Sequence, residues 1–280
     1  MSHVPAEAWK QAIGFGVAGN MTGHLEQAGE AGDFVDVKTA SASAPKGMFP
    51  FYIPGATGAL GVFPVSCDRL VLPEGGGTVQ IEPEVVLDLT LNWSDDGLVS
   101  GVRVHAMAAY NDASIRRQAP KISAKKNWGA ATKGVASTWI ALDGLQSGGF
   151  ADRFQLASFL HRGDTLHAYG EDCPVSGYSY FHQTLLDWIV DRLNHQQDHG
   201  PLEHLAEHLA TAGRPERALI SIGATRYTDF GETHFLQPGD ESVVVVYDGT
   251  VHSAEAVYSA LAARADATLT AASVLRQAVE

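Results

Sequence analysis

The stretch from Phe49 to Asp112 constrains the fold most, because it alternates short apolar runs with glycine and proline. The runs read FPFYIPG, ATGALGVFPV, DRLVLPEGGG and TVQIEPEVVLDLTLNWSDDG, and VSGVRVHAMAAYND continues the pattern. Runs this short and this evenly punctuated are typical of β-strands rather than helices. EGGG and SDDG favour hairpin turns at their positions. The middle of the chain therefore predicts a β-rich fold.

Later segments add further strands and a few helices. Residues 154–170 predict a hairpin that turns at Arg162-Gly163-Asp164, and ALISIGATRY and SVVVVYDG predict two more strands. Apolar residues recur at helical spacing in 178–197, and 253–277 predicts a helical end to the chain. We expect one compact α+β, β-rich domain with three parts: an N-terminal lid or cap segment at 1–48, a catalytic core at 49–250 and a C-terminal helical segment at 251–280.

Charge and cysteine content narrow the functional class. The chain has 19 Lys and Arg against 32 Asp and Glu, a formal net charge of −13, so a basic face for nucleic acid is not expected. Cys67 and Cys173 form no C-x-x-C motif, which suits a reducing compartment. The first residues, MSHVPAEAWKQ, lack a signal-peptide pattern, and no apolar run reaches membrane-spanning length. We expect a cytoplasmic protein with no membrane partner.

A glycine motif near the N-terminus matches the dinucleotide-binding fingerprint in its letters. Gly14-x-Gly16-x-x-Gly19 would need a buried strand before it and a helix after it to receive a pyrophosphate. The preceding AEAWKQA is helix-like, and the following segment is interrupted by Gly23 and Gly29. A tight glycine turn is therefore the favoured interpretation, and no cofactor-binding residue is assigned.

A second motif has the letters of an inverted zinc-protease signature. On a helix, His204 and His208 of H-x-x-E-H would share a face. The neighbouring leucines already define a buried stripe, which leaves these histidines on a polar face beside Glu203 and Glu207. A solvated helix surface is the favoured interpretation.

Acidic residues in the strand region are candidates for cation binding. Glu82 and Glu84 flank Pro83, and alternate residues of a strand project to the same face, so their carboxylates repel unless positive charge lies between them. Taken alone, this motif also fits an exposed acidic edge. Asn111-Asp112 likewise fits ordinary turn chemistry, and a lysine pair such as 125–126 commonly faces solvent.

The order and spacing of these motifs resemble the fumarylacetoacetate hydrolase superfamily from about Ile13 to Tyr247. The order is N-x-x-x-H in a glycine-rich N-terminal segment, E-x-E, N-D-x-S-x-R, K-x-W-G before small residues, I-G-A-T and F-L-x-P-G-D-E. The most specific part is the pairing of IEPEVVLDL with YNDASIRRQ. The resemblance implies a mixed β-sandwich roll with an N-terminal lid segment and peripheral helices, and a homodimer.

The resemblance also implies a metal-dependent site. Glu82, Glu84 and Asp112 match three carboxylate ligands of Mg²⁺ or Mn²⁺, and an all-oxygen set independently favours a hard cation. Lys126 matches a lysine that holds the substrate, and His24 matches a lid histidine that works on water or a proton. Further matching positions are Asn111 and Ser114, which would orient the aspartate, and Arg116, Thr225 and Arg226, which would bind substrate.

The implied reaction is hydrolysis or lysis of a C–C bond in a small anionic 2-oxo or β-diketo acid, as in an acylpyruvate hydrolase or an oxaloacetate decarboxylase. The metal would stabilise an enolate, with His24 as general base or acid. Arg117 stands where the family commonly has an acidic residue. Two further departures are Gln27, which replaces the glutamate of an H-x-x-E lid, and Gly223-Ala224-Thr225, which replaces a G-T-P-x-G turn. These two motivate an alternative, a catalytically silent binding or assembly protein that keeps the fold, with or without the metal.

Overall fold

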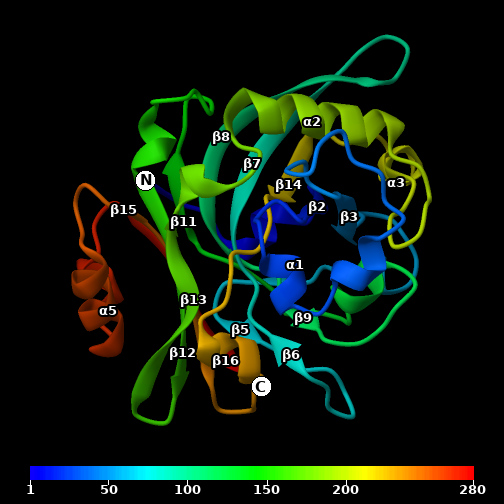
Figure 1. Ribbon diagram of the computed structural model, residues 1–280. Helices are drawn as coiled ribbons and strands as arrows, with labels where there is room; N and C mark the ends of the chain where they lie inside the picture. The colour runs from blue at the N-terminus through cyan, green and yellow to red at the C-terminus, as the bar shows by residue number, and fades with distance from the viewer.

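Two β-sheets share one apolar core in the computed structural model, which describes residues 1–280 (Figure 1). The larger sheet runs in the order β1 (Ser2–His3), β11 (Thr138–Ala141), β8 (Val99–Asn111), β7 (Pro83–Trp93), β14 (Arg217–Ser221), β2 (Ile13–Ala18) and β3 (Gly47–Tyr52), with β10 (Lys133–Val135) paired to β8 and to β4 (Val65–Ser66). The strand-rich α+β prediction is confirmed.

The smaller sheet lies against the larger one. Its order is β13 (Thr165–Pro174), β12 (Phe154–Arg162), β15 (Glu241–Asp248), β16 (Ala272–Val279) and β5 (Arg69–Leu70), and a separate ribbon pairs β6 (Val79–Gln80) with β9 (Ser114–Ile115). Val244 and Val246 of β15 face the shared core, whereas Val243 and Val245 face a second apolar cluster beneath a helix. Because side chains of a strand alternate between its two faces, both faces of the VVVV run are buried.

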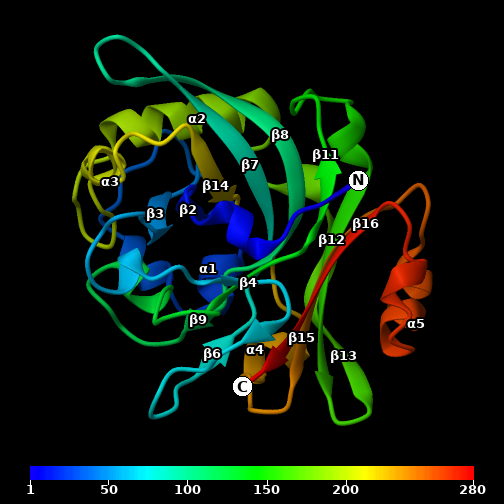
Figure 2. The same ribbon diagram turned by 180° about the vertical axis from the view of Figure 1, so that it is seen from behind.

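Five short helices lie around the sheets: α1 (His24–Gln27), α2 (His182–His195), α3 (Leu205–Thr211), α4 (Asp229–Thr233) and α5 (Ala254–Ala262). Figure 1 shows α2 lying along β7 and β8, and Figure 2 shows α5 on the outer side of the smaller sheet. The expected helix at 178–197 is confirmed: Leu185, Ile189 and Leu193 form its buried stripe. None of the helices has the length and apolarity needed to span a bilayer.

The chain ends in a strand, so the prediction of a helical C-terminus is only half right. Residues 254–262 form α5, but Ala272–Val279 forms β16 between β15 and β5. The alanines of this region favour a helix locally. β16 pairs with β15 over residues 272–278 and with β5 at Ala278 and Val279, and this tertiary context outweighs the local preference.

The first two glycines of the N-terminal motif lie in a strand rather than in a turn, so that prediction is wrong. Gly14 and Gly16 belong to β2, where a Cβ atom would collide with the rings of Phe51 and Phe49 on β3. The missing side chains let these aromatic residues pack directly on the strand. Because β1, β2 and the start of β3 are part of the larger sheet, the expected 1–48 lid segment is divided, and 19–46 is its longest stretch outside the sheet.

The two predicted hairpin turns have opposite outcomes. SDDG joins β7 to β8 as predicted, but the EGGG loop closes no hairpin, because β5 pairs with β16 and β6 pairs with β9.

The H-x-x-E-H histidines lie at the surface at the start of α3, and His204 Nδ1 contacts Glu207 at 2.8 Å. This confirms the polar-face interpretation.

Candidate metal centre

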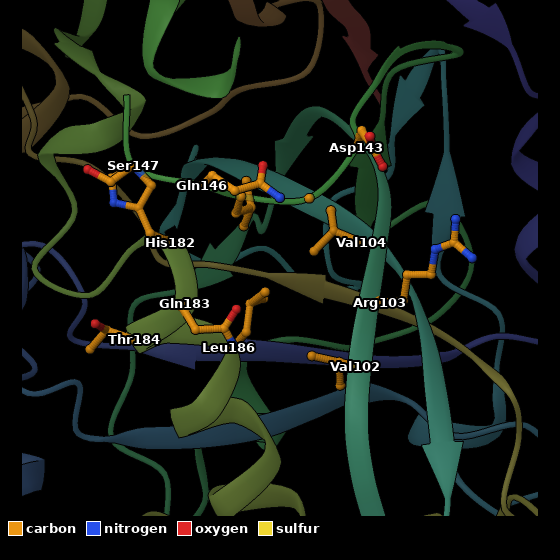
Figure 3. Close-up of a pocket in the computed structure, with 12 residues that line it drawn as sticks. Val102, Arg103, Val104, Asp143, Gln146, Ser147, His182, Gln183, Thr184 and Leu186 are labelled. Carbon is orange, nitrogen blue, oxygen red and sulfur yellow. The ribbon is translucent and has the colours of Figure 1, made fainter. Parts of the chain in front are cut away.

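A wide surface cavity lies away from every residue that the sequence singled out. It encloses about 660 Å³ between β8, the 143–147 loop and the first turn of α2 (Figure 3). At its edge, His182 Nε2 contacts Asp152 at 2.6 Å. Glu82, Glu84 and Asp112 take no part in this cavity, and they form the one group in the protein whose ligand atoms are close enough to hold a metal ion.

The three carboxylates meet where β7 begins and β8 ends. Pro83, the first residue of β7, is in register with Asn111, the last residue of β8, so Glu82 and Glu84 lie beside Asp112. Asp112 N donates to Glu82 O at 2.9 Å. One oxygen of each carboxylate lies within 4.8 Å of the others, and all three residues are buried. The exposed acidic edge that the sequence left open is therefore wrong.

Asn111 links this cluster to the smaller sheet. Its Oδ1 accepts from Glu82 N at 3.1 Å, and its Nδ2 donates to Ser242 Oγ and Gln277 Oε1, each at 3.1 Å. The position predicted to orient the carboxylates is thus built into the junction of both sheets. Ser114 is buried nearby on β9, but its hydroxyl has no hydrogen-bond partner.

Two buried lysines neutralise Asp112. Lys126 Nζ lies 2.6 Å from Asp112 Oδ2 and 2.5 Å from Glu82 Oε2, and Lys133 Nζ lies 3.1 Å from Asp112 Oδ1. Burial lowers the pKa of Lys133 to about 8, although Asp112 opposes this. The sequence analysis missed Lys133. Its position seven residues after Lys126, beyond a run of small residues, was the available signal.

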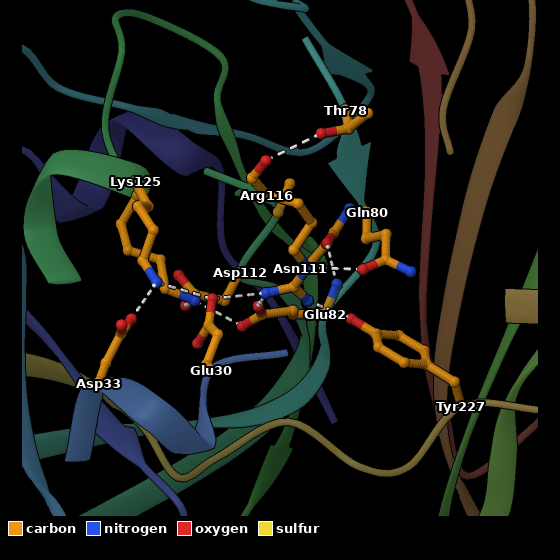
Figure 4. Close-up of polar contacts among 12 residues, drawn as sticks. Glu30, Asp33, Thr78, Gln80, Glu82, Asn111, Asp112, Arg116, Lys125 and Tyr227 are labelled. Atoms are coloured by element: carbon orange, nitrogen blue, oxygen red, sulfur yellow. Dashed lines mark hydrogen bonds and ion pairs between the residues drawn. The ribbon is translucent and has the colours of Figure 1, made fainter. Parts of the chain in front are cut away.

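Arg116 connects the cluster to the N-terminal segment (Figure 4). One guanidinium nitrogen, Nη1, lies 2.8 Å from Glu82 Oε1 and 2.8 Å from Glu30 Oε1, while Nη2 donates to Tyr227 Oη at 2.6 Å. Nε donates to Gln80 Oε1 at 2.5 Å. Burial alone would lower the pKa of Arg116, but these oxygens outweigh burial and raise it, so the guanidinium stays charged.

The positive charge is shared unequally among the three carboxylates. Burial alone would raise the pKa of Glu82, but Lys126 and Arg116 outweigh it and hold that pKa far below its usual range. Glu84 forms no ion pair, and its Oε2 accepts from the Gly223 N–H at 2.9 Å. Burial, followed by the charge on Asp112, raises the pKa of Glu84 well above its ordinary value. A divalent cation would relieve this imbalance, and three carboxylates suit Mg²⁺ or Mn²⁺. The residues present therefore fit such an ion.

His24 lies over this cluster at the start of α1. Its side chain is buried, its Nδ1 has no hydrogen-bond partner, and its ring centroid lies 5.3 Å from that of Tyr227. Burial lowers the pKa of His24 despite the charge of Glu82, so the imidazole is neutral near pH 7 and can accept a proton. The structure thus brings the predicted lid histidine to the predicted metal ligands.

Position 27 lacks the carboxylate of the H-x-x-E pattern, and Glu30 supplies a carboxylate to the site instead. Gly29 has φ +70, and Glu30 N returns to bond Leu25 O at 2.9 Å, which turns the Glu30 side chain inward. Glu30 Oε1 accepts from Lys125 Nζ at 2.9 Å as well as from Arg116, and Asp33 Oδ2 lies 3.2 Å from the same lysine. Lys125 is therefore buried rather than solvent-facing. The sequence missed Glu30 because helical spacing from His24 excludes it.

The two predicted substrate residues after β14 have different placements. Thr225 N donates to Pro83 O at 3.2 Å, and its buried hydroxyl is without a partner, so it lies directly beside the acidic cluster. Arg226 has its side chain half exposed and pairs with Glu171 at 2.6 Å. Arg226 therefore lies at the outer edge of the site rather than within it.

A family model described as "Family of unknown function (DUF5718)" matches residues 30–279. The chain belongs to this family. No curated protein sequence matches the chain.

Solved structures share the fold at low sequence identity. A 5-carboxymethyl-2-hydroxymuconate delta-isomerase from Mycobacterium smegmatis has 12% identity and TM-score 0.52, covering 96% of this chain and 78% of that one. A 2-keto-3-deoxy-D-arabinonate dehydratase complexed with magnesium and 2,5-dioxopentanoate has 10% identity and TM-score 0.51, covering 96% and 72%. These matches confirm the expected strand-rich α+β fold, which the chain shares with both proteins.

Proposed function

We propose that the protein is a divalent-metal-dependent enzyme that breaks a C–C bond in a small 2-oxo or β-diketo acid, as a hydrolase or a lyase. The observation that carries the proposal is the burial of Glu82, Glu84 and Asp112 with their ligand oxygens within 4.8 Å of one another. The magnesium and the oxo compound named for the dehydratase of similar fold support this reading.

The metal would be held by Glu82, Glu84 and Asp112, and it would supply Lewis-acid polarisation of the substrate's keto oxygen. Lys126, held between Glu82 and Asp112, would place a positive charge where negative charge develops. The nearby Thr225 hydroxyl would donate to the acid.

His24 would move the proton that the reaction requires. Its neutral imidazole with a free Nδ1 can accept a proton from water in a hydrolase. In a lyase, His24 would first take up a proton from solvent and then give it to the enolate carbon. Both outcomes use the same residues, so the reaction type depends on the substrate. While the N-terminal segment is closed, the buried His24 side chain also helps to keep bulk water away from the acidic cluster.

Magnesium calorimetry on Glu84→Gln tests the proposal most directly. Glu84 has no cationic partner, so this isosteric change removes a ligand without stranding a buried cation. We expect saturable Mg²⁺ binding in the parent protein and its loss in Glu84→Gln, with unchanged binding in the surface control Glu171→Gln. Equal Mg²⁺ affinity in all three proteins would refute the proposed metal site.

A catalytically silent binding or assembly protein is the second candidate. Two observations favour it: Gln27 replaces the lid carboxylate, and the Lys126 ammonium already bridges Glu82 and Asp112. Thermal unfolding with Mg²⁺ and oxalate separates the candidates. Joint stabilisation favours a working site, and no stabilisation favours the silent protein.

The resemblance also supports a homodimer that acts on a small anionic molecule, and the two cysteines without a C-x-x-C motif support a cytoplasmic location. Sedimentation equilibrium would measure the subunit number. A monomer at micromolar concentration would contradict the proposed assembly.

A further inference from the structure

The Glu30 carboxylate lies in a cradle of two cations that belong to the core. Arg116 Nη1 and Lys125 Nζ lie 2.8 Å and 2.9 Å from the same Glu30 oxygen, Oε1. Arg116 follows strand β9, and Lys125 ends the 3-10 helix Ile122–Lys125. Glu30 itself comes from the N-terminal segment outside the sheets. A carboxylate on a peripheral segment is thus bound by two cations fixed on the core.

This cradle lies on the way from solvent to the acidic cluster. Glu82, Glu84 and Asp112 are buried, so a ligand cannot reach them in this conformation. A cavity of about 490 Å³ lies outside them, lined by Glu30, Asp33, Arg116, Arg117 and Lys125 among nine residues of which one is hydrophobic. Glu30 lines this cavity and Glu82 does not, so a ligand entering there meets Glu30 first. Both carboxylates bind the same Arg116 nitrogen, so Glu30 lies next to Glu82.

The charges of Arg116 and Lys125 determine which ligands can displace Glu30. Displacing Glu30 takes away one of two carboxylates from each cation, because Arg116 keeps Glu82 and Lys125 keeps the partly exposed Asp33. Removing a partner from a buried charge is costly. Paired cations of this kind are the groups that bind carboxylates through charge-assisted hydrogen bonds. A carboxylate can therefore replace Glu30 with little loss of pairing, whereas a neutral ligand cannot.

We propose that Glu30 is an internal substitute for a ligand carboxylate: a small carboxylic acid binds Arg116 and Lys125 in its place and releases the segment around His24. The inference rests on the proposed function and deepens it, because it requires the substrate to present a carboxylate to this cradle. It concerns binding alone, so metal-free protein can test it.

Glu30→Ala, which empties the cradle, provides the test by acetate rescue. With EDTA present, we expect acetate to raise the unfolding midpoint of Glu30→Ala saturably, with an apparent affinity about tenfold or more above that of the parent, in which Glu30 competes. Chloride at equal ionic strength should not substitute. Asp33→Ala is the matched control, since it removes the same charge beside Lys125 but leaves Glu30 in place. Equal acetate responses in the two variants would overturn the proposal.

A second measurement covers the case in which Glu30→Ala does not fold. Hydrogen exchange of residues 24–34 is compared in the parent and in Glu30→Gln, each with and without oxalate. We expect oxalate to speed exchange of this segment in the parent, and Glu30→Gln to exchange fast without it. Oxalate binding that leaves the segment equally protected, or slows its exchange, would overturn displacement of Glu30. Loss of Mg²⁺ binding in Glu84→Gln remains a separate result, so the two proposals fail independently.

Discussion

The side-chain amide of Gln27 bonds both main-chain polar groups of Tyr227. Nε2 donates to Tyr227 O at 3.2 Å, and Oε1 accepts from Tyr227 N at 2.9 Å. A carboxylate could accept the second bond but could not donate the first. The glutamine that departs from the H-x-x-E pattern therefore holds α1, and His24 with it, against the turn that follows β14.

Gln27→Glu should loosen this contact. The change removes a donor and sets a carboxylate against the Tyr227 carbonyl oxygen, at a cost of about 1–3 kcal/mol. We expect faster hydrogen exchange in residues 24–34 with exchange in the sheets unchanged. Glu26→Gln, an exposed change on the same helix, is the control and should leave exchange as it is. Similar exchange in both variants would show that Gln27 does not hold the segment.

Lys126→Met should destabilise the metal-free protein more than the metal-bound one. The substitution leaves Glu82 and Asp112 short of one buried cation, and breaking such pairs typically costs about 3–5 kcal/mol. Bound Mg²⁺ would restore positive charge there. Urea unfolding with EDTA and with Mg²⁺ measures the difference.

Lys121→Met is the control for that experiment, because Lys121 pairs with the exposed Asp198 at 2.7 Å and such a pair contributes about 0–1 kcal/mol. If Mg²⁺ stabilises Lys126→Met no more than Lys121→Met, the cation does not act among these carboxylates.

His24 should make the metal-free protein less stable as the pH falls. Its pKa is lowered in the folded state by burial, so the unfolded chain, with a value near 6.5, takes up the proton first. The free energy of unfolding therefore decreases as the pH falls below about 6.5 and recovers as the pH rises again. His24→Gln should flatten this dependence, whereas the surface variant His208→Gln should retain it. Identical pH profiles for the parent and His24→Gln would contradict the assigned burial effect.

Gly16→Ala should destabilise the fold by about 1–3 kcal/mol, because the added Cβ meets the Phe49 ring. Gly32→Ala is the control, since a Cβ there has no atom within 4 Å. Thermal or urea unfolding compares the two. Comparable stability for both variants would mean that Phe49 moves freely aside.

Local patterns predicted much of the fold and part of the site. Strands β7 and β8 follow from their short apolar runs, and SDDG determines where they turn. Once those strands pair, Glu82 and Asp112 become neighbours through the register of Pro83 with Asn111. The acidic cluster was therefore accessible to sequence reasoning, because hairpin pairing is local.

Contacts between distant segments were not accessible in the same way. No distinctive local sequence pattern marks four residues of the site, and each reaches it only through the packing of separate segments. They are Glu30, Lys125, Lys133 and Tyr227. β16 was mistaken for helix because its pairing partners decide its conformation.

The sequence by itself determined that this chain forms a strand-rich fold with two carboxylates flanking a proline and a third after an Asn. Only the tertiary structure decided that these carboxylates are buried with Lys126, Lys133 and Arg116. The physical reason is that alternation and turn chemistry act between near neighbours. Compensation of buried charge depends instead on which distant side chains the two packed sheets bring within contact distance.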